Sequence, residues 1–241
     1  MLEFRNGSFH LFQAMGIHVF LHWSWLPVAY LLLFDGAFGM SVTWGTLTYI
    51  GLFVIVLLHE FGHALACRSV GGVANKIMLW PLGGMAFVNP PPRPGAVLWS
   101  IAAGPLVNVL LVPVLLVPWL FPVGTLDMEN INGFSGFLFS LLVINVMLLL
   151  FNLLPIYPLD GGQMLQAILW FFIGRAQSLR VVSVLGMICA VPLGLIFMFV
   201  AKNFMGVLVA IFIGWQAWSG FRVAKYLAAQ ERFMNPWERQ L

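Results

Sequence analysis

Charged residues are scarce in this chain. Of its 241 residues, 61% are hydrophobic and only 8% are charged, and the mean hydropathy is +0.98. A soluble domain of this length carries far more surface charge, so the composition excludes one and is typical of a polytopic membrane protein. No polar block is long enough for a second folded unit, so we expect residues 1–241 to form a single integral membrane domain.

Cysteine and clustered positive charge are also lacking. Cys67 and Cys189 lie far apart in apolar stretches, which argues against a disulfide framework. The net charge is +3, but the basic residues are scattered between apolar runs. The expected partner is therefore the lipid bilayer and not nucleic acid. No small-residue cleavage site follows the first apolar run, which indicates a retained membrane segment and not a signal peptide.

Apolar runs of about 20 residues predict six transmembrane helices. Their approximate bounds are Ile17–Leu33, Trp44–Cys67, Val97–Val117, Phe134–Asn152, Val181–Ala201 and Gly206–Tyr226. Strand-forming and turn residues also predict short β-hairpin elements near residues 8–22 and 74–88, the second turning about Gly83-Gly84. The predicted fold class is an all-α polytopic membrane protein with these two hairpins.

The basic residues support this arrangement. Six spans place ten of the eleven on one side of the bilayer: Arg5, Arg68, Lys76, Arg93, Arg175, Arg180, Arg222, Lys225, Arg232 and Arg239. Only Lys202 falls on the other side. The positive-inside rule then places both termini in the cytosol, with His63 near the cytosolic end of the second span.

The sequence His59-Glu60-Phe61-Gly62-His63 ends an apolar run that has no charge from Leu47 onward. Imidazoles and a carboxylate at membrane depth are costly, so they mark a functional site by default. On a helix His59 and His63 share one face, which suits a zinc ion. The alternative is a pair of core histidines bonded to neighbouring carbonyls.

A catalytic zinc site needs a third protein ligand. Only Glu60 and Asp160 lie at apolar depth among the eight carboxylates. Two prolines precede Asp160, and two glycines that permit positive φ follow it. Such broken backbone is tolerated in a membrane only where protein or a water-filled cavity satisfies it. We therefore expect zinc on the two histidines and Asp160, with water in the open fourth position. There are two alternatives: Asp160 only forms a turn, or Cys67 replaces it as the third ligand.

The HExxH pentad, together with Asn-x-x-Pro-x-x-Pro-Leu-Asp-Gly-Gly over residues 152–162, resembles the site-2 protease family of intramembrane zinc metalloproteases. Gly104–Asn108 and the approach Ile17–Trp23 match further elements of that family. The resemblance extends from about Gly7 to Tyr226. No soluble PDZ-type insert lies between the helices and no regulatory nucleotide-binding domain follows them, so the chain resembles a minimal member with core helices at about 44–67, 97–117 and 134–162.

The resemblance implies one zinc ion per chain, which lowers the pKa of its bound water. Glu60 takes the proton and delivers it to the leaving amine. Asn152 is implied as a second donor to the oxyanion or to the substrate backbone. Asn145 shares a helical face with Asn152, and Asn108 could approach from the third helix.

A transmembrane substrate must unwind before cleavage, and its exposed backbone then needs partners. We expect the 74–88 hairpin to offer a sheet edge to that backbone. The expected substrate-binding residues are Ile77, Met78, Leu79, Gly83, Gly84 and Asn108.

The predicted protein is thus a multi-pass intramembrane zinc endopeptidase of the cell membrane. It would cut single-pass membrane proteins in or near their transmembrane segment, close to the cytosol, and release a cytosolic regulator. A regulatory membrane protein or a second copy are further candidate partners.

The residues disfavour three other functions. An HExxH protease of lipidated C-termini would take a glutamate from a later helix, and none follows Glu129 in a predicted span. A metal transporter would gain nothing from Glu60 between the ligands, and a scaffold would not need the full catalytic set. His18 and His22, also four residues apart, stay open between a second metal or haem pair and a structural role at the membrane interface.

Overall fold

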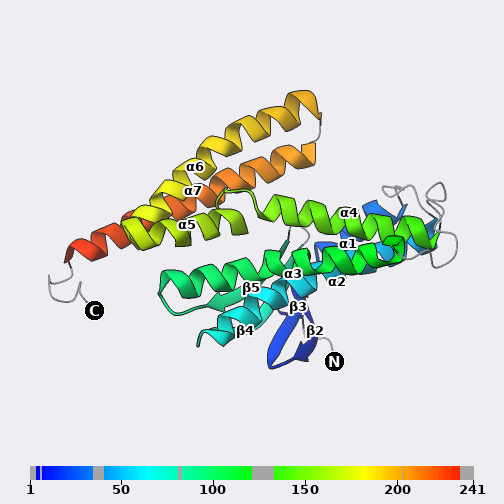
Figure 1. Cartoon of the computed structure of the whole chain (residues 1–241). Helices are drawn as coiled ribbons and strands as arrows, with labels where there is room; N and C mark the ends of the chain where they lie inside the picture. The colour runs from blue at the N-terminus through cyan, green and yellow to red at the C-terminus, as the bar shows by residue number, and fades with distance from the viewer. Residues whose placement is uncertain are drawn as a thin grey trace. The chain divides into compact units, whose positions relative to one another are not determined.

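The computed structural model describes residues 4–5, 7–34, 41–80, 83–120, 133–202 and 204–233. The strands are β1 (Phe4–Arg5), β2 (Ser8–Ala14), β3 (Ile17–His22), β4 (Val73–Trp80) and β5 (Gly83–Asn89). The helices are α1 (Trp25–Phe34), α2 (Val42–Ser69), α3 (Pro94–Leu120), α4 (Phe134–Asn152), α5 (Asp160–Ile173), α6 (Arg175–Leu195), the π-helix η1 (Ile196–Val200) and α7 (Phe204–Phe233) (Figure 1).

Two compact units make up the chain. The first comprises Met1–Pro91 and Ala102–Leu150, and the second comprises Pro92–Ile101 and Phe151–Leu241. The histidine pair of α2 belongs to the first unit, whereas the segment that begins with Asn152 belongs to the second.

The first unit contains a five-stranded sheet in the order β1-β2-β3-β4-β5. Both predicted hairpins are confirmed, as the antiparallel pairs β2–β3 and β4–β5. Strand β3 also pairs with β4 in parallel, from His18 opposite Lys76 to Leu21 opposite Leu79. This pairing joins the two hairpins into one sheet and was not predicted. Gly83 and Gly84 lie in β5, with Gly83 opposite Trp80, so the predicted turn at these glycines was wrong.

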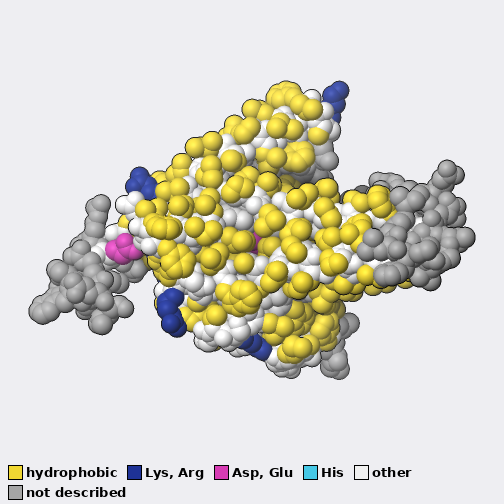
Figure 2. All heavy atoms as spheres, in the orientation of Figure 1, with side chains coloured by type: hydrophobic (Ala, Val, Ile, Leu, Met, Phe, Trp, Pro, Cys, Tyr) yellow, Lys and Arg dark blue, Asp and Glu magenta, His cyan; other side chains and the backbone are white. Residues whose placement is uncertain are grey.

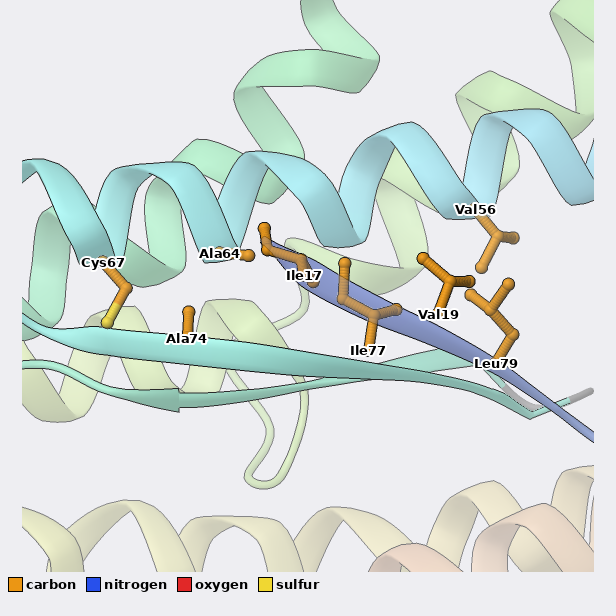
Figure 3. Close-up of a cluster of buried hydrophobic side chains, with 8 residues drawn as sticks. All are labelled: Ile17, Val19, Val56, Ala64, Cys67, Ala74, Ile77 and Leu79. Atoms are coloured by element: carbon orange, nitrogen blue, oxygen red, sulfur yellow. The ribbon is translucent and has the colours of Figure 1, made fainter. Parts of the chain in front are cut away.

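One face of this sheet packs against α2. Figure 3 shows side chains of β3 and β4 pointing toward the helix, and the cluster comprises Ile17, Val19, Val56, Ala64, Cys67, Ala74, Ile77 and Leu79. The alternation of strand side chains puts every second residue on this face. The guanidinium of Arg68, near the end of α2, donates to the carbonyls of Met15 and Gly16 in the β2–β3 turn and to Asn75 Oδ1. The sheet is thus fixed to α2 along its length.

The predicted helices agree with the structure except at two places. The first predicted helix was placed from Ile17, but residues 17–22 form β3, and α1 begins at Trp25. Branched and aromatic residues there pair with strands on both sides, which overrides the apolar run as a helix signal. Helix α5 was missed, because its short amphipathic pattern does not reach the length of a membrane span.

The second unit is built on the antiparallel helices α6 and α7, which lie side by side (Figure 1). Small residues let them approach closely: a Cβ at Gly220 would lie 2.7 Å from Ser183 Oγ, and one at Gly186 would lie 3.0 Å from Ala217 Cβ. Such close approach is the usual mode of helix association in membranes. Leu165 and Leu169 of α5 pack against the cluster of Leu179, Val182 and Ala224.

Five helices of the described residues are long and apolar enough to cross a bilayer: Val42–Ser69, Pro94–Val117, Phe134–Asn152, Arg175–Val200 and Gly206–Glu231. Large apolar side chains on them are exposed, among them Leu110, Val114 and Ile211, each about 60% accessible. Figure 2 shows hydrophobic side chains covering most of the face drawn. A surface this apolar is expected where a protein is in contact with lipid, and not where it is in contact with water. The protein is a multi-pass membrane protein, whereas the predicted count of six spans is not confirmed, and Arg239 lies outside the described residues.

The sheet–helix cluster predicts a clear stability effect. Ile77 is fully buried against α2, so Ile77→Ala should lower the free energy of unfolding by about 2–5 kcal/mol. Val73→Ala, at an exposed position of the same strand, should change it by less than about 0.5 kcal/mol. Reversible unfolding in detergent measures both, and equal effects would contradict the packing described.

Candidate metal centre

The α2 helix places two imidazoles edge to face inside the first unit, with ring centroids 4.7 Å apart and planes at 85°. His59, Glu60 and His63 are 3%, 4% and 5% exposed. The Nε2 atoms of the two histidines are 3.1 Å apart, and the ligand atoms of all three residues lie within 4.8 Å of one another. The four-residue helical spacing brings the rings to one face, as the sequence predicted.

Two asparagines orient His59. Its Nδ1 lies 2.5 Å from Asn108 Oδ1, so Nδ1 carries the proton that it donates to this oxygen. Asn108 Nδ2 donates to Asn145 Oδ1 at 2.8 Å, and Asn145 Nδ2 donates to the Asn108 backbone carbonyl at 2.9 Å. These bonds fix which way the Asn108 amide points, and they leave the His59 Nε2 lone pair directed at His63.

The carboxylate of Glu60 is held by the sheet. The backbone N–H of Ala86 in β5 donates to Glu60 Oε2 at 2.7 Å. Strand β5 is the last strand of the sheet, and this N–H points away from β4. The outer edge of β5 therefore faces the Glu60 carboxylate.

These residues fit a zinc ion. Zinc–nitrogen bonds of about 2.0–2.1 Å at a tetrahedral angle separate two imidazole nitrogens by about 3.3–3.4 Å, close to the 3.1 Å between the Nε2 atoms. Space for an ion depends on Gly104 of α3, because a Cβ there would overlap His63 Nε2 and lie 2.9 Å from His59 Nε2. The hydrogen bond from Nδ1 to an amide oxygen is the usual support of a metal-binding histidine.

A family model and several known proteins match this chain. The model of peptidase family M50 matches residues 47–131 and 121–200. The chain belongs to this family. A zinc metalloprotease of Methanocaldococcus jannaschii is 35% identical over 91% of this chain and 62% of its own length. The zinc metalloprotease named Rip3 of Mycobacterium tuberculosis is 28% identical over 93% of this chain and 64% of its own length.

The solved structure of a site-2 protease from Methanocaldococcus jannaschii is also similar, with a TM-score of 0.66 and 32% identity over 89% of this chain and 95% of that one. The resemblance to the site-2 proteases and the expectation of zinc as the cofactor are thereby confirmed. The chain spans somewhat less than two thirds of the length of the two metalloprotease relatives that it matches.

Asp160 and Asn152 lie in the second unit. Asn152 is the last residue of α4 and Asp160 the first of α5, where the helix N-terminus favours a carboxylate. The turn between them folds back so closely that a Cβ at Gly161 would overlap the Leu153 carbonyl and one at Gly162 would overlap Ile156. The glycines are thus needed for close packing and not, as expected, for positive φ. The part of both polar residues in the metal centre stays a prediction.

Three expected substrate-binding residues do not lie at a free edge. Ile77, Met78 and Leu79 belong to β4, which pairs with β3 on one side and β5 on the other. Their side chains are buried. Gly83 and Gly84 do lie in the edge strand β5, and Asn108 contacts His59. The prediction of an edge in this hairpin was right for β5 and wrong for β4.

The remaining histidines and Cys67 lie elsewhere. His18 and His22 are on a strand, so the helical spacing assumed for a metal pair does not apply. His18 Nδ1 is 3.2 Å from His10 Nε2, and the His22 ring stacks on Trp80 at 4.0 Å. The Cys67 thiol donates to the Val73 carbonyl within the sheet–helix cluster, so it packs as a small hydrophobe.

Two contacts of the metal centre were missed by sequence reasoning. The Ala86 N–H is a backbone group, and no side-chain pattern marks it. Gly104 is marked in the sequence only as part of the element Gly104–Asn108, and its contact with both imidazoles could not be anticipated without the crossing point of α2 and α3. Asn145 carried a signal, as an amide at membrane depth.

The hydrogen bond from His59 to Asn108 predicts a change in metal affinity. Asn108→Ala should weaken zinc binding about 10–100-fold, because the His59 ring loses the acceptor that fixes its tautomer. Competition with a fluorescent chelator measures the affinity. Ser100→Ala is the control on α3, since Ser100 donates to the Ala96 carbonyl of its own helix and should leave affinity unchanged. Wild-type affinity in Asn108→Ala would show that the ring needs no such support.

Proposed function

We propose that this M50 chain is an intramembrane zinc endopeptidase. It hydrolyses peptide bonds in or near the transmembrane segment of membrane-tethered proteins, and single-pass proteins are its substrates. The observation that carries the proposal is the buried HExxH group, in which two imidazole nitrogens converge beside a carboxylate that faces a sheet edge. A transporter has no use for a carboxylate fixed in this way.

In this proposal His59 and His63 bind the zinc, and Asp160 is the third ligand. Zinc bound there supplies a Lewis acid that lowers the pKa of a coordinated water and polarises a carbonyl. Asn108 and Asn145 keep Nδ1 of His59 protonated, so that Nε2 presents its lone pair. The support for Asp160 is its place in the family motif and the scarcity of other carboxylates at apolar depth.

Glu60 acts as the general base and acid. Its carboxylate accepts a proton from the attacking water and delivers it to the leaving nitrogen. The Ala86 N–H favours the charged carboxylate and fixes its orientation. Asn152 donates to the oxyanion or to the substrate backbone, a role that rests on the motif it shares with the family.

The outer edge of β5 binds the unwound substrate. Backbone groups of alternate residues in a strand face the same edge, so Gly84 and Val88 face outward with Ala86. A substrate strand added there would pair its backbone without strict readout of side chains. It would also lie next to Glu60, because the Ala86 N–H already reaches that carboxylate.

Both termini lie in the cytosol in this proposal, and the metal centre lies near the cytosolic side. The support is the distribution of Lys and Arg over the predicted loops. Cleavage at this depth would release a cytosolic regulator.

Removing the general base tests the reaction directly. Glu60→Gln keeps the shape of the side chain but cannot accept a proton, so cleavage should fall about 10²–10⁴-fold while the zinc content stays at that of the wild type. The assay is co-expression with a panel of single-pass membrane proteins, read by immunoblot, with zinc measured by elemental analysis. Glu231→Gln is the control for loss of a carboxylate. Equal cleavage by Glu60→Gln and wild type would refute the proposed mechanism.

The contact with the sheet edge can be removed without changing Glu60. Ala86→Pro lacks the N–H donor, and a hydrogen bond to a charged group is worth roughly 1.5–3 kcal/mol, so cleavage should fall about tenfold or more. Ala86→Ser keeps the donor and should cleave nearly as wild type. Zinc content should be unchanged in both variants. Undiminished cleavage by Ala86→Pro would mean that neither the base nor the substrate uses this edge.

A further inference from the structure

A groove with two cationic side chains lies between α6 and α7 in the second unit. It has a volume of about 400 Å³ and is lined by Ala176, Gln177, Arg180, Ala224, Lys225, Ala228 and Ala229. Four of these residues are alanines, whose small side chains leave the space open between the start of α6 and the later turns of α7. Neither the fold nor the proposed proteolysis requires this groove.

The two cations converge on one aromatic ring. The guanidinium carbon of Arg180 lies 5.7 Å from the centroid of Phe221, and Nζ of Lys225 lies 4.8 Å from the same centroid. The lining residues that the structure describes include no carboxylate to neutralise them. Two like charges held beside one ring repel each other, and an anion between them relieves that repulsion.

The position of the groove indicates which anion binds. Both walls are helices long and apolar enough to cross a membrane. Arg180 lies five residues after the start of α6, and Lys225 lies eight residues before the end of α7. Arg222 stacks on Trp218 at 4.2 Å and Arg175 on Trp170 at 5.3 Å in the same region. Arginine with tryptophan is typical of the headgroup layer, and basic pockets between helices at that depth bind anionic headgroups.

We propose that this groove binds the headgroup of an anionic phospholipid, with the phosphodiester between Arg180 and Lys225. Gln177 offers an amide donor to the phosphate oxygens. The small side chains of Ala224 and Ala228 make room for the headgroup. The acyl chains extend along the apolar surfaces of α6 and α7.

Native mass spectrometry of the full chain in detergent tests this proposal by titration with phosphatidylglycerol and phosphatidylcholine. Phosphatidylglycerol should bind about tenfold more tightly or better, and Arg180→Gln with Lys225→Gln should remove that preference, at about fivefold per charge. The matched control is Lys202→Gln with Arg222→Gln, which removes two positive charges outside the groove. It should keep the preference.

Two further measurements separate a built site from diffuse attraction. Ala228→Phe fills the groove and keeps both charges, so it should abolish the preference; wild-type binding by this variant would overturn the site. Inorganic phosphate at the concentration of the lipid should not displace phosphatidylglycerol, and displacement would assign the groove to a soluble anion. Equal binding of the two lipids by the wild type would also overturn the proposal.

Discussion

The close approach of α3 to α2 is the contact on which the metal centre depends. At Gly62 a Cβ would lie 2.6 Å from the Ala103 carbonyl oxygen, and at Gly104 it would overlap His63. The two helices therefore meet closely at these glycines, with Gly62 against the Ala103 carbonyl and the Val107 side chain, and Gly104 against the His63 ring. This spacing leaves room beside both Nε2 atoms and brings Asn108, one turn further along α3, within reach of His59. A larger residue at either glycine would separate the helices and remove both features together.

The other faces of α2 have different tasks. Val56, Ala64 and Cys67 pack against the sheet, and Glu60 reaches its edge strand. One helix thus presents imidazoles to α3, a carboxylate to β5 and an apolar surface to β3 and β4. Polar groups at membrane depth are satisfied here by neighbouring protein groups, as a lipid environment demands. The same arrangement excludes bulk water from the histidine pair.

Much of this could be predicted because its signals are local. The HExxH spacing fixed the relation of His59 to His63, and apolar length with turn residues located the hairpins and the long helices. The parallel pairing of β3 with β4 could not be predicted, because it joins segments far apart in sequence and depends on the sheet packing on α2. The same applies to the Ala86 N–H and to Gly104, whose roles come from the crossing of elements. The prediction of a sheet edge at Ile77–Leu79 was wrong because the residues of a strand do not show which other strands pair with it.

The continuous sheet has a consequence for mutagenesis. Strand β5 orients Glu60, β4 supports β5, and β4 is paired in turn with β3 of the N-terminal hairpin. A substitution that disrupts β2 or β3 would disturb β4 and then β5, and so displace the Glu60 carboxylate, without changing any metal ligand. A mutational scan scored only by activity would then count the N-terminal hairpin among the catalytic elements. Variants of this hairpin that keep their zinc but change the turnover number would show that it acts by supporting β5, the strand that orients Glu60.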